Sequence, residues 1–240
     1  MEERVYRLVY EQEEEHWWFR GRRAVISAML AQADRPEPPR VLDAGCGTGR
    51  NLELYASLGE AEGVDPSPEA VGLCRQRGLE GVRVGDAEDL PFEDERFGLV
   101  AATDVIEHVP DDRAALAEMR RVAAPGARLL LTVPAYAWLW TAEDDRLGHY
   151  RRYTLGELRE RCRGAGWSPE LGTYFNSLLL APIALARRLP GRDAGRRDLE
   201  RTPAALNGPL SLPMRAEAAL IRRGLRLPAG VSVALLCRRA

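Results

Sequence analysis

The stretch that determines the fold is Val41-Leu42-Asp43-Ala44-Gly45-Cys46-Gly47-Thr48-Gly49. Its apolar start predicts a β-strand, and residues 50–58 after it predict a helix. The three glycines therefore fall in a strand-to-helix turn. Glycine has no Cβ and tolerates positive φ, so a ligand can approach the backbone and the free N–H groups of the helix start. We expect a nucleotide-like cofactor at this turn.

The spacing of this turn separates classes of cofactor. The dinucleotide motif G-x-G-x-x-G needs a glycine at position 50, where the chain has Arg50. A P-loop needs a Gly-Lys-Ser/Thr ending, and the sequence contains no lysine. Asp43 stands two positions before the first glycine, where its carboxylate would crowd a pyrophosphate and attract a cation. The turn therefore favours a ligand with a positive amino or sulfonium group.

A second acidic residue supports a nucleoside ligand. Residues 61–65 predict a strand that ends in Asp65, which follows Gly45 by 20 residues. In half-folds of this kind, a carboxylate at about this separation binds the hydroxyl groups of a ribose.

Four motifs in this order resemble those of class I S-adenosylmethionine-dependent methyltransferases. Residues 43–49 match the D-x-G-x-G-x-G loop of that family, and residues 85–92, 104–109 and 125–134 continue the resemblance. It covers roughly residues 40–175. The resemblance implies S-adenosyl-L-methionine as the cofactor and an enzyme that transfers a methyl group to an oxygen or nitrogen of a small organic acceptor.

The chain beyond the glycine turn alternates between strand and helix patterns. This alternation predicts a Rossmann-like, doubly wound α/β sheet, mostly parallel, with helices on both faces. The resemblance adds an antiparallel last strand. We expect one methyltransferase domain over 1–240, with an N-terminal helical cap at 1–35, a cofactor-binding core at 40–175, a helical insertion at 176–230 and the last strand at 231–240. About 55 residues separate the final two strands, too many for an ordinary hairpin loop. The insertion therefore suits a lid or a dimer surface.

The resemblance also implies roles for donor-site residues. Backbone at Gly45 and Gly47 would approach the donor, and Asp43 would interact near its methionine end. Asp65 would bind the ribose beside Pro66, and Thr103 would lie close to the methionine part. The resemblance implies that Asp86 and Ala87 contact the adenine. Alternatively, Asp86 only caps the turn that follows it.

Residues 5–33 have a helical pattern, which predicts N-terminal helices that carry His16-Trp17-Trp18-Phe19-Arg20. Three adjacent aromatic side chains cannot all point inward on one helix. One interpretation is that they fix the helix to the core. The other is that the helix closes over the donor, with Trp18 and Arg20 in contact with it. Nucleic-acid binding by the arginines here is disfavoured by the preceding acidic run.

The acceptor is expected against residues 136–154, which follow the fifth strand and combine aromatic surface with a few polar groups. His149 is the candidate catalytic base, because an imidazole with a pKa near ~6.5 accepts protons at neutral pH. Alternatively, His149 caps the helix that begins at Thr154. Arg152 either holds an acidic substrate group or pairs with a nearby aspartate, and His108 is expected to be structural. Further acceptor contacts are assigned to Tyr136, Trp138, Tyr150 and Tyr153.

Composition narrows the remaining choices. The formal net charge is only −2, which argues against a nucleic-acid partner. The four cysteines are scattered without a C-x-x-C pair, so we expect reduced thiols, a cytoplasmic protein and no metal. Neither a secretory signal nor a transmembrane segment is expected, whereas contact with a membrane surface and a homodimer stay open. Two alternatives for the function remain: a nicotinamide-dependent reductase, or a cofactor-binding partner without catalysis.

Overall fold

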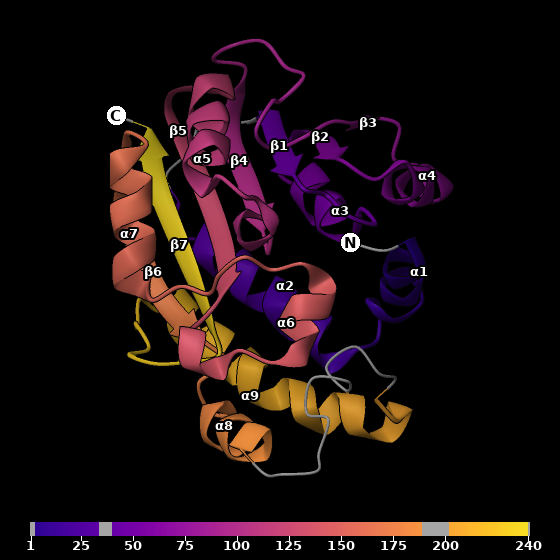
Figure 1. Ribbon diagram of the computed structural model, residues 1–240, viewed down its shortest axis with the longest axis vertical. Coiled ribbons are helices and arrows are strands. Elements are labelled where there is room, and N and C mark those ends of the chain that lie inside the picture. Colours follow the sequence, from indigo (N-terminus) through magenta and orange to yellow (C-terminus); the bar gives the residue numbers. More distant parts are fainter. Residues whose placement is uncertain (1–2, 34–39, 189–201, 240) are drawn as a thin grey trace.

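The computed structural model describes residues 3–33, 40–188 and 202–239. Within these ranges a seven-stranded sheet has the order β3-β2-β1-β4-β5-β7-β6 (Figure 1). Strands β1 to β5 are parallel, and β7 runs antiparallel to both β5 and β6. The predicted α/β class, the mostly parallel sheet and the antiparallel last strand are therefore confirmed. The strands are β1 (Arg40–Ala44), β2 (Glu60–Asp65), β3 (Val82–Val84), β4 (Phe97–Thr103), β5 (Ala123–Pro134), β6 (Trp167–Phe175) and β7 (Ser232–Arg239).

Helices flank both faces of the sheet and cover its carboxyl-terminal edge. The helices are α1 (Glu3–Gln12), α2 (Trp17–Leu30), α3 (Arg50–Ala56), α4 (Pro68–Gln76), α5 (Asp112–Val122), α6 (Ala142–Leu147), α7 (Leu155–Gly164), α8 (Leu180–Arg188) and α9 (Ala204–Arg222). Two short 3-10 turns, η1 (Ile106–His108) and η2 (Ala137–Leu139), follow β4 and β5. Among the described helices, none combines the length and the apolar character that crossing a membrane requires.

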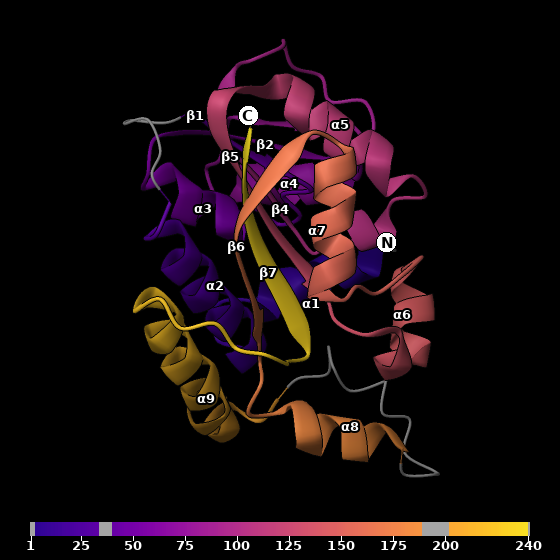
Figure 2. The same ribbon diagram turned by 90° about the vertical axis from the view of Figure 1, so that its left-hand side faces the viewer.

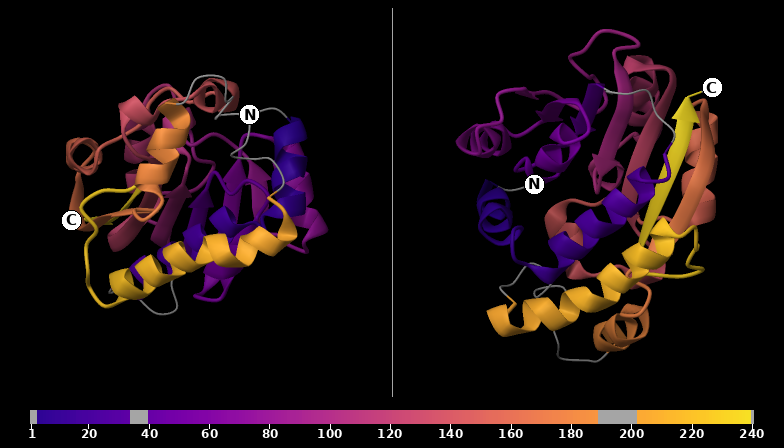
Figure 3. Two further views of the ribbon diagram at one scale, coloured as in Figure 1. Left: turned by 90° about the horizontal axis from the view of Figure 1, so that it is seen from below. Right: turned by 180° about the vertical axis from the view of Figure 1, so that it is seen from behind.

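The central strands are apolar on both sides, as expected for parallel strands between two helical layers. In β4, Val100 packs in the layer of α5 and α7, whereas its neighbours Leu99 and Ala101 pack in the layer of α2 and α9. The two layers are visible from opposite sides of the sheet in Figures 1 and 3. Figure 2 shows α7 beside β6 and β7, with α8 beyond the end of the sheet.

Helices α2 and α9 run side by side across one face of the sheet (Figure 3). A Cβ atom on Gly21 would lie 2.5 Å from Sδ of Met214, so the absence of a side chain at Gly21 permits this close approach. The α9 helix begins at Ala204, whereas the sequence pattern in this part of the insertion predicts a helix only near residues 214–225; α9 contains Pro209 and Pro213. Prolines disfavour a helix interior, which is why the sequence pattern indicated a later start.

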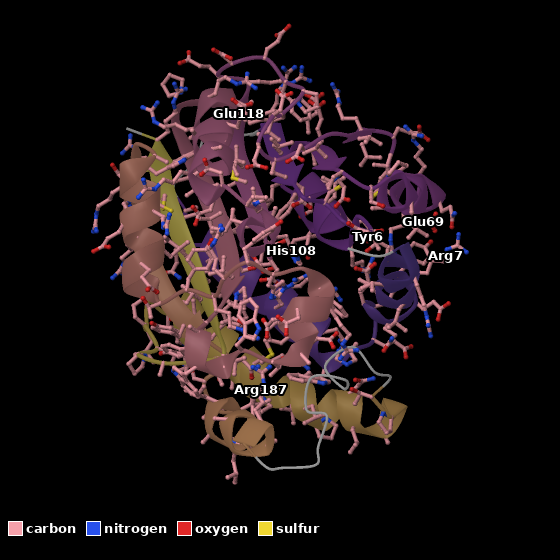
Figure 4. All side chains as sticks on the ribbon, in the orientation of Figure 1. Tyr6, Arg7, Glu69, His108, Glu118 and Arg187 are labelled. Atoms are coloured by element: carbon pink, nitrogen blue, oxygen red, sulfur yellow. The ribbon has the colours of Figure 1, made fainter. Side chains whose placement is uncertain are left out.

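The N-terminal segment forms two helices, α1 and α2. The chain leaves the helical conformation between Glu13 and His16 and restarts at Trp17. His16 is the N-cap of α2: its backbone is extended, and its Nδ1 accepts a hydrogen bond from the N–H of Trp18 at 3.3 Å. The break lets α1 turn against α4, where Tyr6, Arg7 and Glu69 lie together (Figure 4).

Candidate functional site

The glycine turn between β1 and α3 has the backbone that its sequence predicts. Gly45, Gly47 and Gly49 all have positive φ, at 76°, 53° and 87°. A Cβ atom on Gly45 would collide with Val105, and one on Gly49 with Leu79, so these two glycines are required by packing. Gly47 differs, because nothing lies within 4 Å of the position of its missing Cβ. Its open side is therefore available to a ligand.

Asp65 ends β2 and is held in one orientation by three hydrogen bonds. Its Oδ2 accepts from the N–H of Gly47 at 2.9 Å, and its Oδ1 accepts from the N–H of Ser67 at 3.0 Å and the hydroxyl of Tyr6 at 3.1 Å. Only 4% of Asp65 is exposed, and burial raises its pKa above the ordinary value. The side chain therefore ties the glycine turn to α1.

Asp43 is a buried carboxylate without a described hydrogen-bond partner on either oxygen. Asp43 is 1% exposed, and burial raises its pKa to about 7. The nearby charge of Arg22 lowers this pKa, and the charge of Asp65 raises it. Asp43 does not line the cavity described below. It therefore lies behind the cavity wall as a charge that a cationic ligand would stabilise.

A cavity of about 510 Å³ lies at the carboxyl ends of the parallel strands, with Gly47 and Asp65 in its wall. This is the edge at which ligands bind in such sheets. Of the other residues predicted from the resemblance, those that line the same cavity are Trp18, Gly45, Pro66, Asp86, Ala87 and Thr103. Asp86 also accepts a hydrogen bond from the N–H of Glu88 at 3.0 Å, so it caps its turn as well. Thr103 Oγ1 accepts from Asn51 at 2.9 Å.

Helix α2 presents aromatic rings and one arginine to the cavity. Trp17, Trp18 and Phe19 all line it, and Trp18 stacks on Phe175 with the ring centres 6.0 Å apart. Arg20 is exposed and lies outside the lining, whereas Arg22 is in the wall and pairs with Asp104. The predicted donor contact Arg20 is therefore not part of the cavity lining, since its position and that of Arg22 differ by about 200° around a helix.

Burial and ion pairing shift the pKa of Arg22 in opposite directions. Burial lowers its pKa, but the Asp104 carboxylate more than compensates, and the net pKa is raised. Asp104 has a positive φ of 58°, and its Oδ1 also accepts from the hydroxyl of Thr132 at 3.0 Å. The turn after β4 is therefore fixed by contacts to both α2 and β5.

His149 lies in the cavity wall and is oriented by Asp144. Its Nδ1 is 2.8 Å from Oδ1 of Asp144, and Arg152 binds both carboxylate oxygens of Asp144 at 2.8 Å. Burial alone would raise the pKa of Asp144, but the hydrogen bonds from His149 and Arg152 hold it below the usual range. Arg152 also lines the cavity. Its contact with Asp144 agrees with one of the two interpretations of this residue, namely that it pairs with a nearby aspartate.

The alternative role for His149, as a cap of the following helix, is filled by other residues. Thr154 and Glu157 form the complete capping box of α7, with Thr154 N–H donating to Glu157 Oε2 at 2.7 Å. His149 instead adjoins His108, and the two ring centres are 4.5 Å apart. Burial, followed by the proximity of His149, lowers the pKa of His108 to about 4.

The four aromatic residues assigned to the acceptor lie outside this cavity lining. Tyr153 is 2% exposed, and its hydroxyl donates to Asp112 at 2.9 Å, so it is a core residue. Trp138 and Tyr150 are 55% and 58% exposed. Tyr136 stacks between Trp138 and Tyr174. Their positions depend on how the segment after β5 folds back, which aromatic composition does not reveal.

The cavity wall also contains residues that were not predicted from the sequence. Glu107 lies between the strand ends and the His149 segment, and Asn176, Ile183 and Arg187 reach the cavity from the insertion. Arg187 also donates to the carbonyl of Leu139. The insertion also contains Arg192, Arg196 and Arg197, which lie outside the described residues.

Comparison with known proteins agrees with this geometry. Residues 42–131 match the family model described as a methyltransferase domain. Ajmaline N-methyltransferase of Rauvolfia serpentina is 36% identical over 68% of this chain and 60% of its own length. Ubiquinone biosynthesis O-methyltransferase of Xanthomonas oryzae pv. oryzae is 39% identical over 39% of this chain and 42% of its own length. The chain thus spans about half the length of the curated relatives it matches.

A solved structure extends the likeness across the sheet. Phosphoethanolamine N-methyltransferase 2 of Haemonchus contortus, in complex with S-adenosyl-L-methionine, superposes with a TM-score of 0.59 at 18% identity, over 90% of this chain and 52% of that chain. The residues present fit this cofactor, because Gly47 offers open space and Asp43 an unpaired buried carboxylate. The chain therefore has the fold of class I S-adenosylmethionine-dependent methyltransferases, and residues 42–131 match a methyltransferase domain.

Proposed function

We propose that this protein binds S-adenosyl-L-methionine and transfers its methyl group to an oxygen or nitrogen of a small organic acceptor. The observation that carries the proposal is one cavity with two differently equipped walls. The glycine turn and Asp65 form one wall, and His149 with its aspartate partner forms part of another. The two relatives named above, one an N- and one an O-methyltransferase, are consistent with either acceptor atom.

The donor wall is suited to an adenosyl ligand. The open side of Gly47 permits close approach of a ligand to the backbone, and Asp65 offers oxygens at the adjacent strand end. Asp86 and Ala87 follow β3 along the same edge. When bound, S-adenosyl-L-methionine supplies an electrophilic methyl group. The carboxylate of Asp43, behind the wall, would favour the positive charge of the ligand.

The chain's own contribution to catalysis is alignment and proton removal. Holding two reactants in line supplies much of the rate enhancement in a displacement of this kind. His149 is oriented through Nδ1 by Asp144, which leaves its Nε2 atom to accept a proton from the acceptor. Trp17, Trp18 and Phe19 would exclude water from the donor side.

We further propose that the insertion at 176–230 acts as a lid within a single domain, because Ile183 and Arg187 of α8 reach the cavity wall. Leu185, Leu206 and Leu212 in the same region are exposed, which favours a homodimer contact there. A cytoplasmic location without a nucleic-acid partner is part of the same proposal. Sedimentation of the wild-type chain tests the homodimer: a monomer at all concentrations would contradict it.

Transfer from radiolabelled methyl donor tests the function directly. Amine and phenol acceptors are incubated with the wild-type chain and with His149→Ala. Labelled product that falls strongly in the variant, with donor affinity retained, is the expected result. Donor binding without transfer to any acceptor would favour the alternative of a cofactor-binding partner. Hydride transfer from a nicotinamide, without methyl transfer, would favour a reductase.

A further inference from the structure

Glu107, His108 and His149 form a compact cluster in the cavity wall where His149 is proposed to meet the methyl acceptor. Each residue offers one ligand atom, and these atoms lie within 4.8 Å of one another. Glu107 and His108 belong to η1 after β4, whereas His149 follows α6. A backbone hydrogen bond from Tyr150 N–H to the carbonyl of Glu107, at 2.7 Å, holds the two segments together.

Glu107 is a buried carboxyl group without a hydrogen-bond partner among the described residues. The residue is 1% exposed, and neither carboxylate oxygen has a described hydrogen-bond partner. The two arginines nearby are already committed, since Arg22 pairs with Asp104 and Arg152 with Asp144. Burying a carboxyl group without a partner is unfavourable, and more so when the group is ionised. A cation at Glu107 would supply the missing partner.

The histidines have the support that metal-binding imidazoles usually have. Nδ1 of His149 is hydrogen-bonded to Asp144, which leaves Nε2 for a metal ion. His108 forms a hydrogen bond with the backbone of Leu147. Metal-ligating histidines almost always bond their other ring nitrogen to a carboxylate or backbone group in this manner.

We propose that Glu107, His108 and His149 bind one divalent transition-metal ion such as Zn²⁺, which in turn binds an oxygen of the methyl acceptor. Two imidazoles and one carboxylate suit Zn²⁺ and leave an open coordination position. Two ligands of tetrahedral zinc lie about 3.4 Å apart, so the ligand atoms, now within 4.8 Å of one another, would move closer together when an ion binds. Mg²⁺ prefers oxygen ligands and is disfavoured.

The proposal rests on the proposed methyltransferase function and changes the role of His149 within it. A hydroxyl that binds a divalent ion releases its proton to solvent near neutral pH, because the ion stabilises the resulting oxyanion. His149 then acts as a metal ligand rather than as the base itself. The metal ion in the cavity wall opposite the donor would thus hold the acceptor oxygen in its deprotonated form.

Titration of untagged, chelator-treated protein with Co²⁺, followed by its visible absorption, and with Zn²⁺, followed by calorimetry, tests the site. We expect one ion per chain and no competition by Mg²⁺. Binding in Glu107→Gln and His149→Asn should be weaker by about 100-fold or more, because loss of a residue that only orients a ligand already costs about 10- to 100-fold. Glu88→Gln removes a carboxylate from the same cavity outside the cluster, and His16→Asn changes a histidine that is not in the cluster; both should bind normally.

Two outcomes would overturn the proposal: failure of the wild-type chain to bind either ion at one per chain, or equal affinity in the cluster variants and the controls. Glu107→Gln keeps the shape of a buried side chain, so loss of metal is separable from loss of fold by circular dichroism. Donor affinity is measured in the same samples. Donor binding without metal binding would refute the metal site while leaving the proposed function standing.

Discussion

Replacing Asp43 with asparagine should stabilise the folded protein at alkaline pH while weakening donor binding. Burial raises the pKa of Asp43 from its ordinary value near 3.8 to about 7. The folded state therefore holds a proton that the unfolded state has lost between those two values. By linkage, the wild-type stability contributed by this group falls as the pH rises from about 4 to about 7, and it levels off above that.

The magnitude follows from the same shift. About 3 pKa units at about 1.36 kcal/mol each give a total near 4 kcal/mol, of which about 3 kcal/mol falls between pH 5 and pH 8. The asparagine side chain of the variant does not titrate, so any fixed cost of burying its amide cancels when the two pH values are compared. The gain in unfolding free energy of Asp43→Asn over wild type should be about 3 kcal/mol larger at pH 8 than at pH 5.

Urea unfolding at the two pH values measures this difference, with Asp89→Asn as the control because Asp89 is exposed. The control should follow the wild-type profile. Donor affinity at pH 8 should fall about tenfold or more in Asp43→Asn, since a charge pair within about 8 Å contributes about 2 kcal/mol at an effective dielectric near 20. Parallel stability profiles for Asp43→Asn and wild type would refute this reasoning.

Three further changes test other parts of the structure. His149→Ala should reduce turnover by about 100-fold or more with donor affinity nearly unchanged; full activity in a steady-state assay would exclude a role at the reacting atoms. Gly21→Val should destabilise the fold by about 2–3 kcal/mol in urea, because its Cβ would meet the Met214 side chain; an unchanged midpoint would contradict the close packing of α2 on α9. Arg77→Met should cost about 3 kcal/mol by leaving Glu13, 2.6 Å away, buried without its ion-pair partner; a loss below about 0.5 kcal/mol would show that the pair is unimportant.

The sheet could be predicted because its signals are local. A run such as 41–44, followed at once by glycines, specifies a strand and a turn within a few residues. The order of these units then fixes which strand ends share an edge, since parallel strands require crossover connections. Asp65 could be placed beside Gly47 on this basis alone, and the two are joined by a 2.9 Å hydrogen bond.

The N-terminal helices show where local signals are insufficient. The break before Trp17 depends on the side chain of His16 as an N-cap, and histidine is not among the usual capping residues. Glu13, which lies in the break, hydrogen-bonds to Thr48 of the glycine turn. Because the break sets how α2 faces the cavity, the position of Arg20 outside the cavity lining could not be predicted from the sequence.

The acceptor side depends on contacts between distant segments. Glu107 and His149 are far apart in sequence and meet only because the chain after β5 folds back onto η1. The resemblance of residues 104–109 implies a structural role for His108 and does not indicate a cluster with His149. Conversely, Tyr153 resembles a surface aromatic in its basic neighbourhood, yet a buried aspartate binds its hydroxyl.

Calorimetric titration of S-adenosyl-L-methionine into the wild-type chain and Asp65→Ala tests most directly whether this cavity is the donor site. We expect one donor per wild-type chain and affinity about 10- to 100-fold weaker in the variant, as for loss of hydrogen bonds to a charged group. Absence of donor binding to the wild-type chain, or equal affinity in a folded Asp65→Ala, would contradict the assignment.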